Sequence, residues 1–262
     1  MKLAHCLVPV LTIGVALLGV QGAAAAWHET FLGDGVAVHY VRLTGHGGDN
    51  EANRRNVLAM HQGCVDVNTA MGNPSKPLPA GGVPPVVSTK EIEIYYAANR
   101  TVTIKQGTLY DIDLTDCALV GTVHHIVEFA WYGGSCDADL IRKQARGFCD
   151  AAALAASAVA PLRPVSPNLG SEETRVVAGT PCQVHRFDPR YERCIAHPGP
   201  LQASNPNPIP AAPFNGGVRG LLLEANTPAL TLRAQEVRMN LSVSNELFLL
   251  PPGMKINPGA RR

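Results

Sequence analysis

Hydrophobic and polar side chains alternate in short runs through the middle of the chain. The runs cover Glu91–Tyr96, Thr101–Lys105, Thr108–Leu114 and Val123–Tyr132. The first three are separated by dipeptides that favour turns, Asn99-Arg100 and Gln106-Gly107. A period of two places alternate side chains on opposite faces of a strand. Short strands joined by such turns predict an antiparallel meander.

The C-terminal third continues this pattern. Leu230–Val243 is the clearest strand, because every second residue from Val237 to Val243 is apolar and the others are polar. That alternation is typical of a sheet with one face in water. Gly220–Ala225 predicts a preceding strand, Arg175–Ile195 predicts a hairpin, and Val36–Leu43 predicts a strand near the N-terminus.

Helices are harder to assign from the pattern. Asn50–Met71 suits either a helix or a strand, and so does Cys136–Arg146. Ala151–Ala156 is strongly helix-forming, so we expect a helix from Phe148 onward. Segments rich in proline and glycine predict surface loops at residues 72–90, 161–170 and 198–217.

Together these elements predict an α+β fold. We expect a curved, half-barrel-like antiparallel β-sheet with one or two helices, reinforced by disulfides. The sheet and its loops would form a single β-rich domain over residues 27–256, followed by a tail at 257–262. A chain of this length can bury a sizeable core, so disulfides would add to that core and not replace it.

The N-terminus has the features of a secretory signal peptide over residues 1–26. Lys2 precedes an apolar run from Leu7 to Val20, and small residues then lead to Trp27. After its removal, 21 basic residues balance 21 acidic ones. This balance argues against a nucleic-acid partner, which needs a clustered basic face. We expect no later membrane span, and a periplasmic or extracellular location.

Six cysteines remain after the signal peptide, and an even number in an oxidising compartment favours disulfides. Cys182 and Cys194 flank a turn-like segment, so this pair ranks first. Cys136 and Cys149 would pair across a hairpin, but not along a helix, where they would be ~20 Å apart. Cys64 would then pair with Cys117. Pairings that mix Cys117, Cys136 and Cys149 are nearly as well supported.

Several polar groups could carry chemistry. His124-His125 could hold a metal ion, but adjacent residues of a strand point to opposite faces, which favours a structural role. Asp111, Asp113 and Asp116 lack the ligand order of a calcium loop and suit the wet face of a strand. We therefore expect no cofactor and no metal ion.

A nucleophile is the other chemical possibility. Gly133-Gly134-Ser135-Cys136 could form a sharp turn, but it lacks the G-x-S-x-G arrangement. Ser135 is more typical of a cap or turn, and a free thiolate at Cys136 would break the even cysteine count. An exported hydrolase with an unrecognised nucleophile therefore stays an alternative, and we predict no catalytic residue.

The last third resembles the periplasmic lipoprotein-carrier (LolA-like) superfamily. The similar segments are Val177–Val184, Arg193–Ala196, Gly220–Leu223 and the ending Glu246–Gly253, which reads E-L-F-L-L-P-P-G. The resemblance implies a half-barrel wrapped around helices, with an apolar concavity that carries acyl chains or other apolar cargo. It also implies that Phe248 and Leu250 plug the open end of the sheet.

These features predict an exported, non-enzymatic protein that binds an apolar or lipid-like molecule. One face of several strands would line the site, although the same residues would also suit an ordinary core. The predicted lining residues are Ile94, Val102, Ile104, Phe129, Trp131, Leu232 and Met239. A structural or interaction module of the cell envelope, with a protein partner, is a further alternative.

Overall fold

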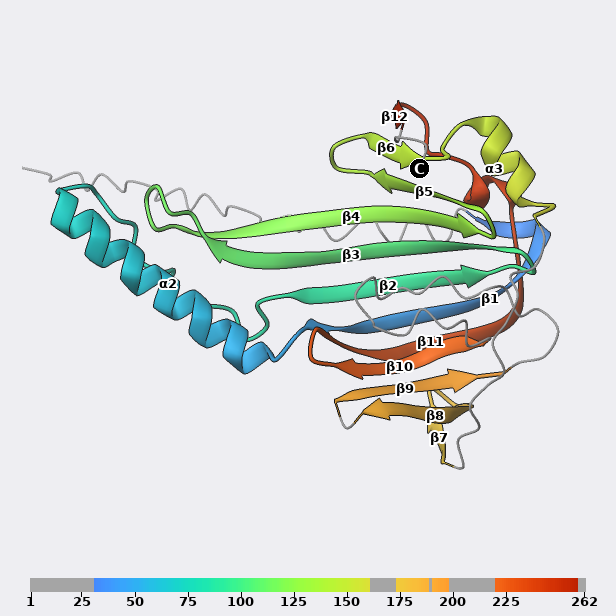
Figure 1. Cartoon of the computed structure of the whole chain (residues 1–262), viewed down its shortest axis with the longest axis horizontal. Coiled ribbons are helices and arrows are strands. Elements are labelled where there is room, and N and C mark those ends of the chain that lie inside the picture. The colour runs from blue at the N-terminus through green and yellow to red at the C-terminus, as the bar shows by residue number, and fades with distance from the viewer. Residues whose placement is uncertain (1–30, 161–172, 189, 198–219, 259–262) are drawn as a thin grey trace, which may run out of the picture.

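The alternating segments assemble into one open sheet in the computed structural model, which describes residues 31–160, 173–188, 190–197 and 220–258 (Figure 1). Its twelve described strands run in the order β12-β6-β5-β4-β3-β2-β1-β11-β10-β9-β8-β7. Only β12 and β6 pair in parallel; the other neighbours are antiparallel. The signal peptide predicted at residues 1–26, the loops at 161–170 and 198–217 and most of the tail lie outside the described residues.

The strands are β1 (Leu32–Gly47), β2 (Thr89–Tyr96), β3 (Arg100–Ile112), β4 (Leu119–Trp131), β5 (Gly134–Asp139), β6 (Gln144–Gly147), β7 (Thr174–Val177), β8 (Thr180–Asp188), β9 (Tyr191–Ala196), β10 (Leu221–Thr227), β11 (Leu230–Val243) and β12 (Lys255–Pro258). The helices are α2 (Asn50–Met71), α3 (Ala151–Ser157) and the 3-10 turn η1 (Asn245–Phe248). The expected α+β class is confirmed, with a mostly antiparallel open sheet and two α-helices in the described chain.

The ambiguous segment from Asn50 to Met71 is a helix, α2. The Asp49 carboxylate accepts hydrogen bonds from the backbone N–H groups of Glu51 and Ala52, both at 3.0 Å, which caps the first turn. Gly72 ends the helix with a left-handed φ of 70°. These two residues mark both ends of the helix more clearly than the apolar pattern between them does.

The turn expected at Gln106-Gly107 is absent, and this prediction is wrong. β3 runs through both residues as one strand of 13 residues. Gly107 is needed there for space, because a Cβ atom at this position would lie 2.1 Å from the carbonyl oxygen of Thr89 and 2.9 Å from the ring of His124. A glycine within an alternating run therefore marks close strand packing here.

The segment that follows β4 resolves into a hairpin. β5 and β6 pair antiparallel, with Cys136 opposite Gly147. The helix expected from Phe148 begins later, at Ala151, because the Asp150 side chain caps it by accepting from the N–H of Ala153 at 2.8 Å.

Both faces of the central strands are buried. On β2, Ile94 and Tyr96 belong to one apolar cluster, the first core, which also contains residues of β8–β11. Tyr95 points to the opposite face and belongs to the second core, together with residues of β3–β6 and α3. The open sheet therefore has two separate cores on opposite faces.

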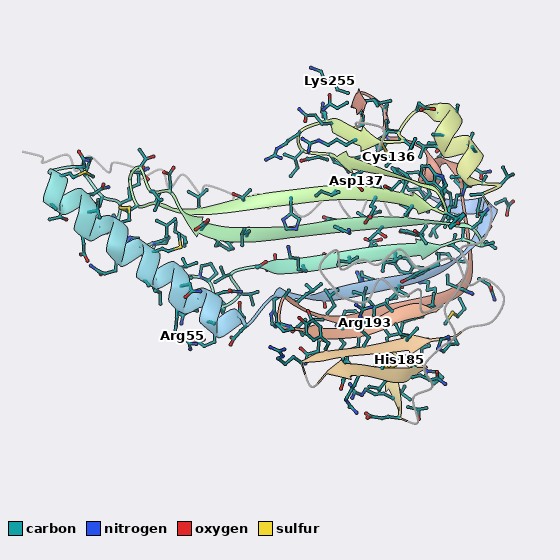
Figure 2. All side chains as sticks on the ribbon, in the orientation of Figure 1. Arg55, Cys136, Asp137, His185, Arg193 and Lys255 are labelled. Carbon is teal, nitrogen blue, oxygen red and sulfur yellow. A yellow bond between two sulfur atoms is a disulfide. The ribbon has the colours of Figure 1, made fainter. Side chains whose placement is uncertain are left out.

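Three disulfides join the described cysteines. They link Cys182 to Cys194, Cys136 to Cys149 and Cys64 to Cys117, with Cα–Cα distances of 5.4, 5.0 and 5.7 Å. Val184, and not Cys182, lies directly opposite Cys194, so the first pair crosses the β8–β9 hairpin diagonally. The hairpin of β5 and β6 brings Cys136 and Cys149 together (Figure 2).

The end of the chain closes the second core. Leu247 and Phe248 of η1 are buried in it, and Leu250 packs against its edge. The Arg100 guanidinium lies 3.9 Å from the centroid of the Phe248 ring, which is a cation–π contact.

Candidate functional site: an apolar arm

β3 and β4 extend beyond the part of the sheet that β5 covers. β5 pairs with β4 only from Ile126 to Trp131, so among the described residues the segment Leu119–His124 has a neighbouring strand on its β3 side alone. Helix α2 lies beside this extension and projects away from the body of the sheet (Figure 1). We call α2 together with residues 108–123 the arm.

A small third core holds the arm together. Val57 and Cys64 of α2 pack against Ile112 of β3 and Cys117 of the turn between β3 and β4, and Val83 and Val87 complete the cluster. The Cys64–Cys117 disulfide links the helix covalently to that turn. The arm is therefore held in one arrangement by a covalent bond as well as by packing.

Hydrogen bonds at both ends of α2 also hold the arm in this arrangement. The buried Asn68 side chain donates to the carbonyl oxygens of Pro74 and Thr115, both at 3.3 Å. At the other end of α2, the Asn50 side-chain oxygen accepts from the N–H of Val87 at 3.1 Å. Each end of α2 is thus fixed to a loop.

The acidic residues predicted not to bind calcium shape the turn at the tip. The Asp113 carboxylate accepts from the N–H of Thr115 at 2.9 Å, and that of Asp116 accepts from Ala118 at 3.0 Å. Asp116 also forms a 2.6 Å ion pair with Lys76, and this pair lowers the pKa of the Asp116 carboxyl. Within the described residues no three His, Cys, Asp or Glu side chains are grouped to hold a metal ion.

Exposed apolar side chains concentrate on the arm. It carries eight of the seventeen large hydrophobic residues that are exposed in the described chain, although it is a much smaller share of that chain. The eight are Leu58, Met60, Val67, Met71, Leu109, Leu114, Val120 and Val123. Met60, Val67 and Met71 are spaced to lie on one side of α2, whereas Arg55 lies on the side turned away from β3 (Figure 2).

An open cleft of about 450 Å³ lies where the arm joins the sheet. Its lining includes Asn53 and Val57 of α2, Leu109 and Tyr110 of β3, and the turn between β10 and β11. The Asn53 amide donates to the carbonyl of Gly47 at 2.8 Å, which ties the start of α2 to the end of β1. None of the predicted ligand-binding residues lines this cleft.

The residues predicted to line one apolar concavity lie in several places. Ile94 and Leu232 belong to the first core, on one face of the sheet. On the opposite face, Val102, Ile104 and Phe129 are buried in the second core and Trp131 packs against its edge. Met239 is 37% exposed. The structure therefore does not bring these residues together on one surface.

His124 and His125 point to opposite faces of β4, because they pair with successive residues of β3. The His124 ring nitrogen lies 3.5 Å from the ammonium nitrogen of Lys90. Burial, followed by the charge of Lys90, lowers the pKa of His124, and burial lowers the pKa of Lys90. The two histidines thus face opposite sides of the sheet and do not form a joint ligand set.

Ser135 and Cys136 do not form a hydrolase site with these histidines. The Cys136 sulfur is used in a disulfide, so it supplies no thiolate. Ser135 is paired with Ala130, five residues along β4 from His125. Five strand residues span ~17 Å, far beyond hydrogen-bond reach.

A buried carboxylate lies elsewhere in the sheet. Glu93 accepts hydrogen bonds from the hydroxyl groups of Tyr95 at 2.9 Å and Tyr40 at 3.3 Å. Burial and the charge of Glu93 raise the pKa of both tyrosines. Sequence reasoning missed this group, because a glutamate in an alternating strand suits a wet face equally well.

The chain matches no family model, no curated protein and no solved structure. In the described part of the chain, neither helix combines the length and the apolarity needed to cross a bilayer. The arm is thus the feature on which a functional proposal can rest, and it was not singled out from the sequence. The sequence signals that point to it are the apolar residues Met60, Val67 and Met71 at helical spacing and the uncharged run Leu119–Ile126.

Proposed function

We propose that this is an exported, non-enzymatic interaction protein that uses the arm to bind a protein partner. The observation that carries the proposal is the concentration of exposed apolar side chains on a segment fixed by the Cys64–Cys117 disulfide. Apolar patches on a surface are typical of interaction sites. A preorganised surface also loses less conformational freedom on binding, which favours affinity.

The chemistry of α2 favours a protein over a membrane surface as the partner. Helices that lie on membranes carry lysine and arginine on their polar face. The half of α2 that holds Met60, Val67 and Met71 contains Asp66 and no lysine or arginine. We call Met60, Val67 and Met71 the α2 stripe. A complementary apolar groove or helix of another protein suits this stripe better than a membrane surface does.

Export is supported by two features. The three disulfides suit an oxidising compartment, and residues 1–26 have the pattern of a cleaved signal. We expect the mature chain to begin at Trp27, in the periplasm or outside the cell. N-terminal sequencing of the secreted protein checks this, and a mature chain beginning at Met1 would contradict it.

Binding of an apolar or lipid-like molecule remains a prediction from the sequence. Six of its seven proposed lining residues pack into or against the two cores, so the geometry favours the arm as the interaction site. The resemblance to lipoprotein carriers would then concern the sheet and its L-F-L-L-P-P-G ending rather than the site.

Charge substitutions on the arm test the proposal. Val67 is 55% exposed on α2, and Val176 is 64% exposed on β7, far from the arm, so Val67→Lys and Val176→Lys make a matched pair. We expect proteins that co-purify with the wild type and with Val176→Lys to be lost with Val67→Lys. Equal recovery of these proteins with all three forms would overturn the proposal. So would a result in which Val67→Lys loses bound phospholipid and no protein.

A further inference from the structure

In the part of the chain that the structure describes, the outer edge of β4 has free backbone hydrogen-bonding groups. His125 directs its carbonyl oxygen to the side of β5, where it accepts from Leu140 at 2.9 Å. Because the direction alternates along a strand, Leu119, Gly121 and Val123 direct their N–H and C=O groups to the same side. β5 does not reach these residues, and no other described residue pairs with them, so within the described chain the edge offers six unpaired groups.

As far as the described residues go, this edge also lacks the usual protection against pairing with another strand. Native edges are blocked by charged side chains, proline, bulges or a covering element. The run L-V-G-T-V-H-H-I from Leu119 to Ile126 contains no lysine, arginine, aspartate, glutamate or proline. It pairs with β3 in unbroken register. Val120 and Val123 are exposed on its two faces.

From this geometry we infer that the edge of β4 pairs antiparallel with the same edge of a second copy of the chain. The inference rests on the proposed function and names a partner for one part of the arm. A two-fold axis at Gly121 places it opposite its own copy and Leu119 opposite Val123. This register pairs all six free backbone groups of each copy and leaves the His125 carbonyl hydrogen-bonded to the Leu140 N–H.

Charge favours a second copy as the occupant. In the antiparallel arrangement, the tip of one arm lies beside the turn between β5 and β6 of the other copy. Three carboxylates and one lysine lie at the tip: Asp111, Asp113, Asp116 and Lys76. The turn carries Arg142 and Lys143, with Asp139 as the nearby acid. Acidic tips would therefore meet basic turns at both ends of the shared edge.

Val123→Pro tests the pairing, because it removes an N–H that points to the open edge and no bond to β3. Two hydrogen bonds would be lost per dimer, so we expect the dimer dissociation constant to rise roughly 30-fold. Sedimentation of the mature protein over a concentration series measures it. Val123→Lys is the second variant, in case proline disturbs the fold, and Val176→Lys on β7, outside the arm, is the control that leaves the edge intact.

Mixed cysteine variants test the register. Val120 of one copy would face Thr122 of the other at a non-hydrogen-bonded position, with Cα atoms about 4.5 Å apart, within disulfide range. We expect Val120→Cys mixed with Thr122→Cys to cross-link, and Thr122→Cys alone to cross-link far less. Cross-linking by Thr122→Cys alone would overturn this register.

A monomeric wild type at every concentration would overturn the self-pairing. The same result would leave the proposed function standing, provided that Val67→Lys still loses a partner which the wild type retains. Conversely, a dimer weakened by Val123→Pro together with unchanged partner recovery by Val67→Lys would support self-pairing and overturn binding through the α2 stripe. The two proposals therefore fail through different measurements.

Discussion

Removal of the Cys64–Cys117 disulfide should release the arm while leaving most of the sheet intact. The bridge closes a sequence separation of 53 residues, for which the chain-entropy relation gives a stabilisation of about 4 kcal/mol. Among the described residues, the third core contains six buried residues, with four partly buried ones packed against them, so the apolar packing that holds α2 is limited. We therefore expect Cys64→Ala/Cys117→Ala to speed hydrogen exchange in α2 by up to roughly 10³-fold.

The Cys182–Cys194 bridge supplies the matched control. Its separation is 12 residues, and the same relation gives about 3 kcal/mol. Cys182→Ala/Cys194→Ala should therefore speed exchange in β7–β9 and leave α2 protected. Exchange measured by mass spectrometry on both variants distinguishes the regions. Unchanged protection of α2 in Cys64→Ala/Cys117→Ala, or an equal loss of protection across the sheet in both variants, would refute the conclusion that the Cys64–Cys117 disulfide fixes the arm.

Four substitutions test the packing. Phe248→Ala should destabilise the fold by about 3–5 kcal/mol in chemical denaturation, because the ring is buried in the second core; a loss under 1 kcal/mol would contradict this. Burial lowers the pKa of His39 from 6.5, so stability should fall as pH drops below about 6.5, where the unfolded chain takes up a proton that the folded chain resists. His39→Asn should make this pH dependence of stability shallower. An unchanged slope would show that burial of His39 is not its cause. Gly107→Ala should lower the melting temperature, because the new methyl group would clash with Thr89. Gly63→Ala in α2, with open space around it, should stabilise the fold by about 0.5–1 kcal/mol. A less stable Gly63→Ala together with a more stable Gly107→Ala would refute this packing.

The strands were predictable where side-chain alternation and turn signals agreed. The predicted strand Leu230–Val243 coincides with β11. The turn at Gln106-Gly107 was mispredicted because a glycine that permits close strand packing looks the same in sequence as one that permits a turn. Local pattern therefore located most strands but not every boundary.

The candidate site was much less predictable. Alternation shows that Ile94 and Val102 each face a core, but it does not show that these cores lie on opposite faces of the sheet. That division depends on how the rest of the chain packs against the two faces of β2 and β3, which is a property of the tertiary structure. The arm was missed for the same reason, because Val123 is exposed beside a part of β4 that β5 does not reach, and its own sequence does not show where β5 ends.

The proposed function requires the arm to be the surface that contacts another protein. A photoreactive amino acid placed at position 67 of α2, and separately at position 176 of β7, tests this in cells that export the protein. We predict a discrete protein adduct from position 67 and none from position 176. Adducts from position 176 alone, or none from either position, would contradict binding through the arm.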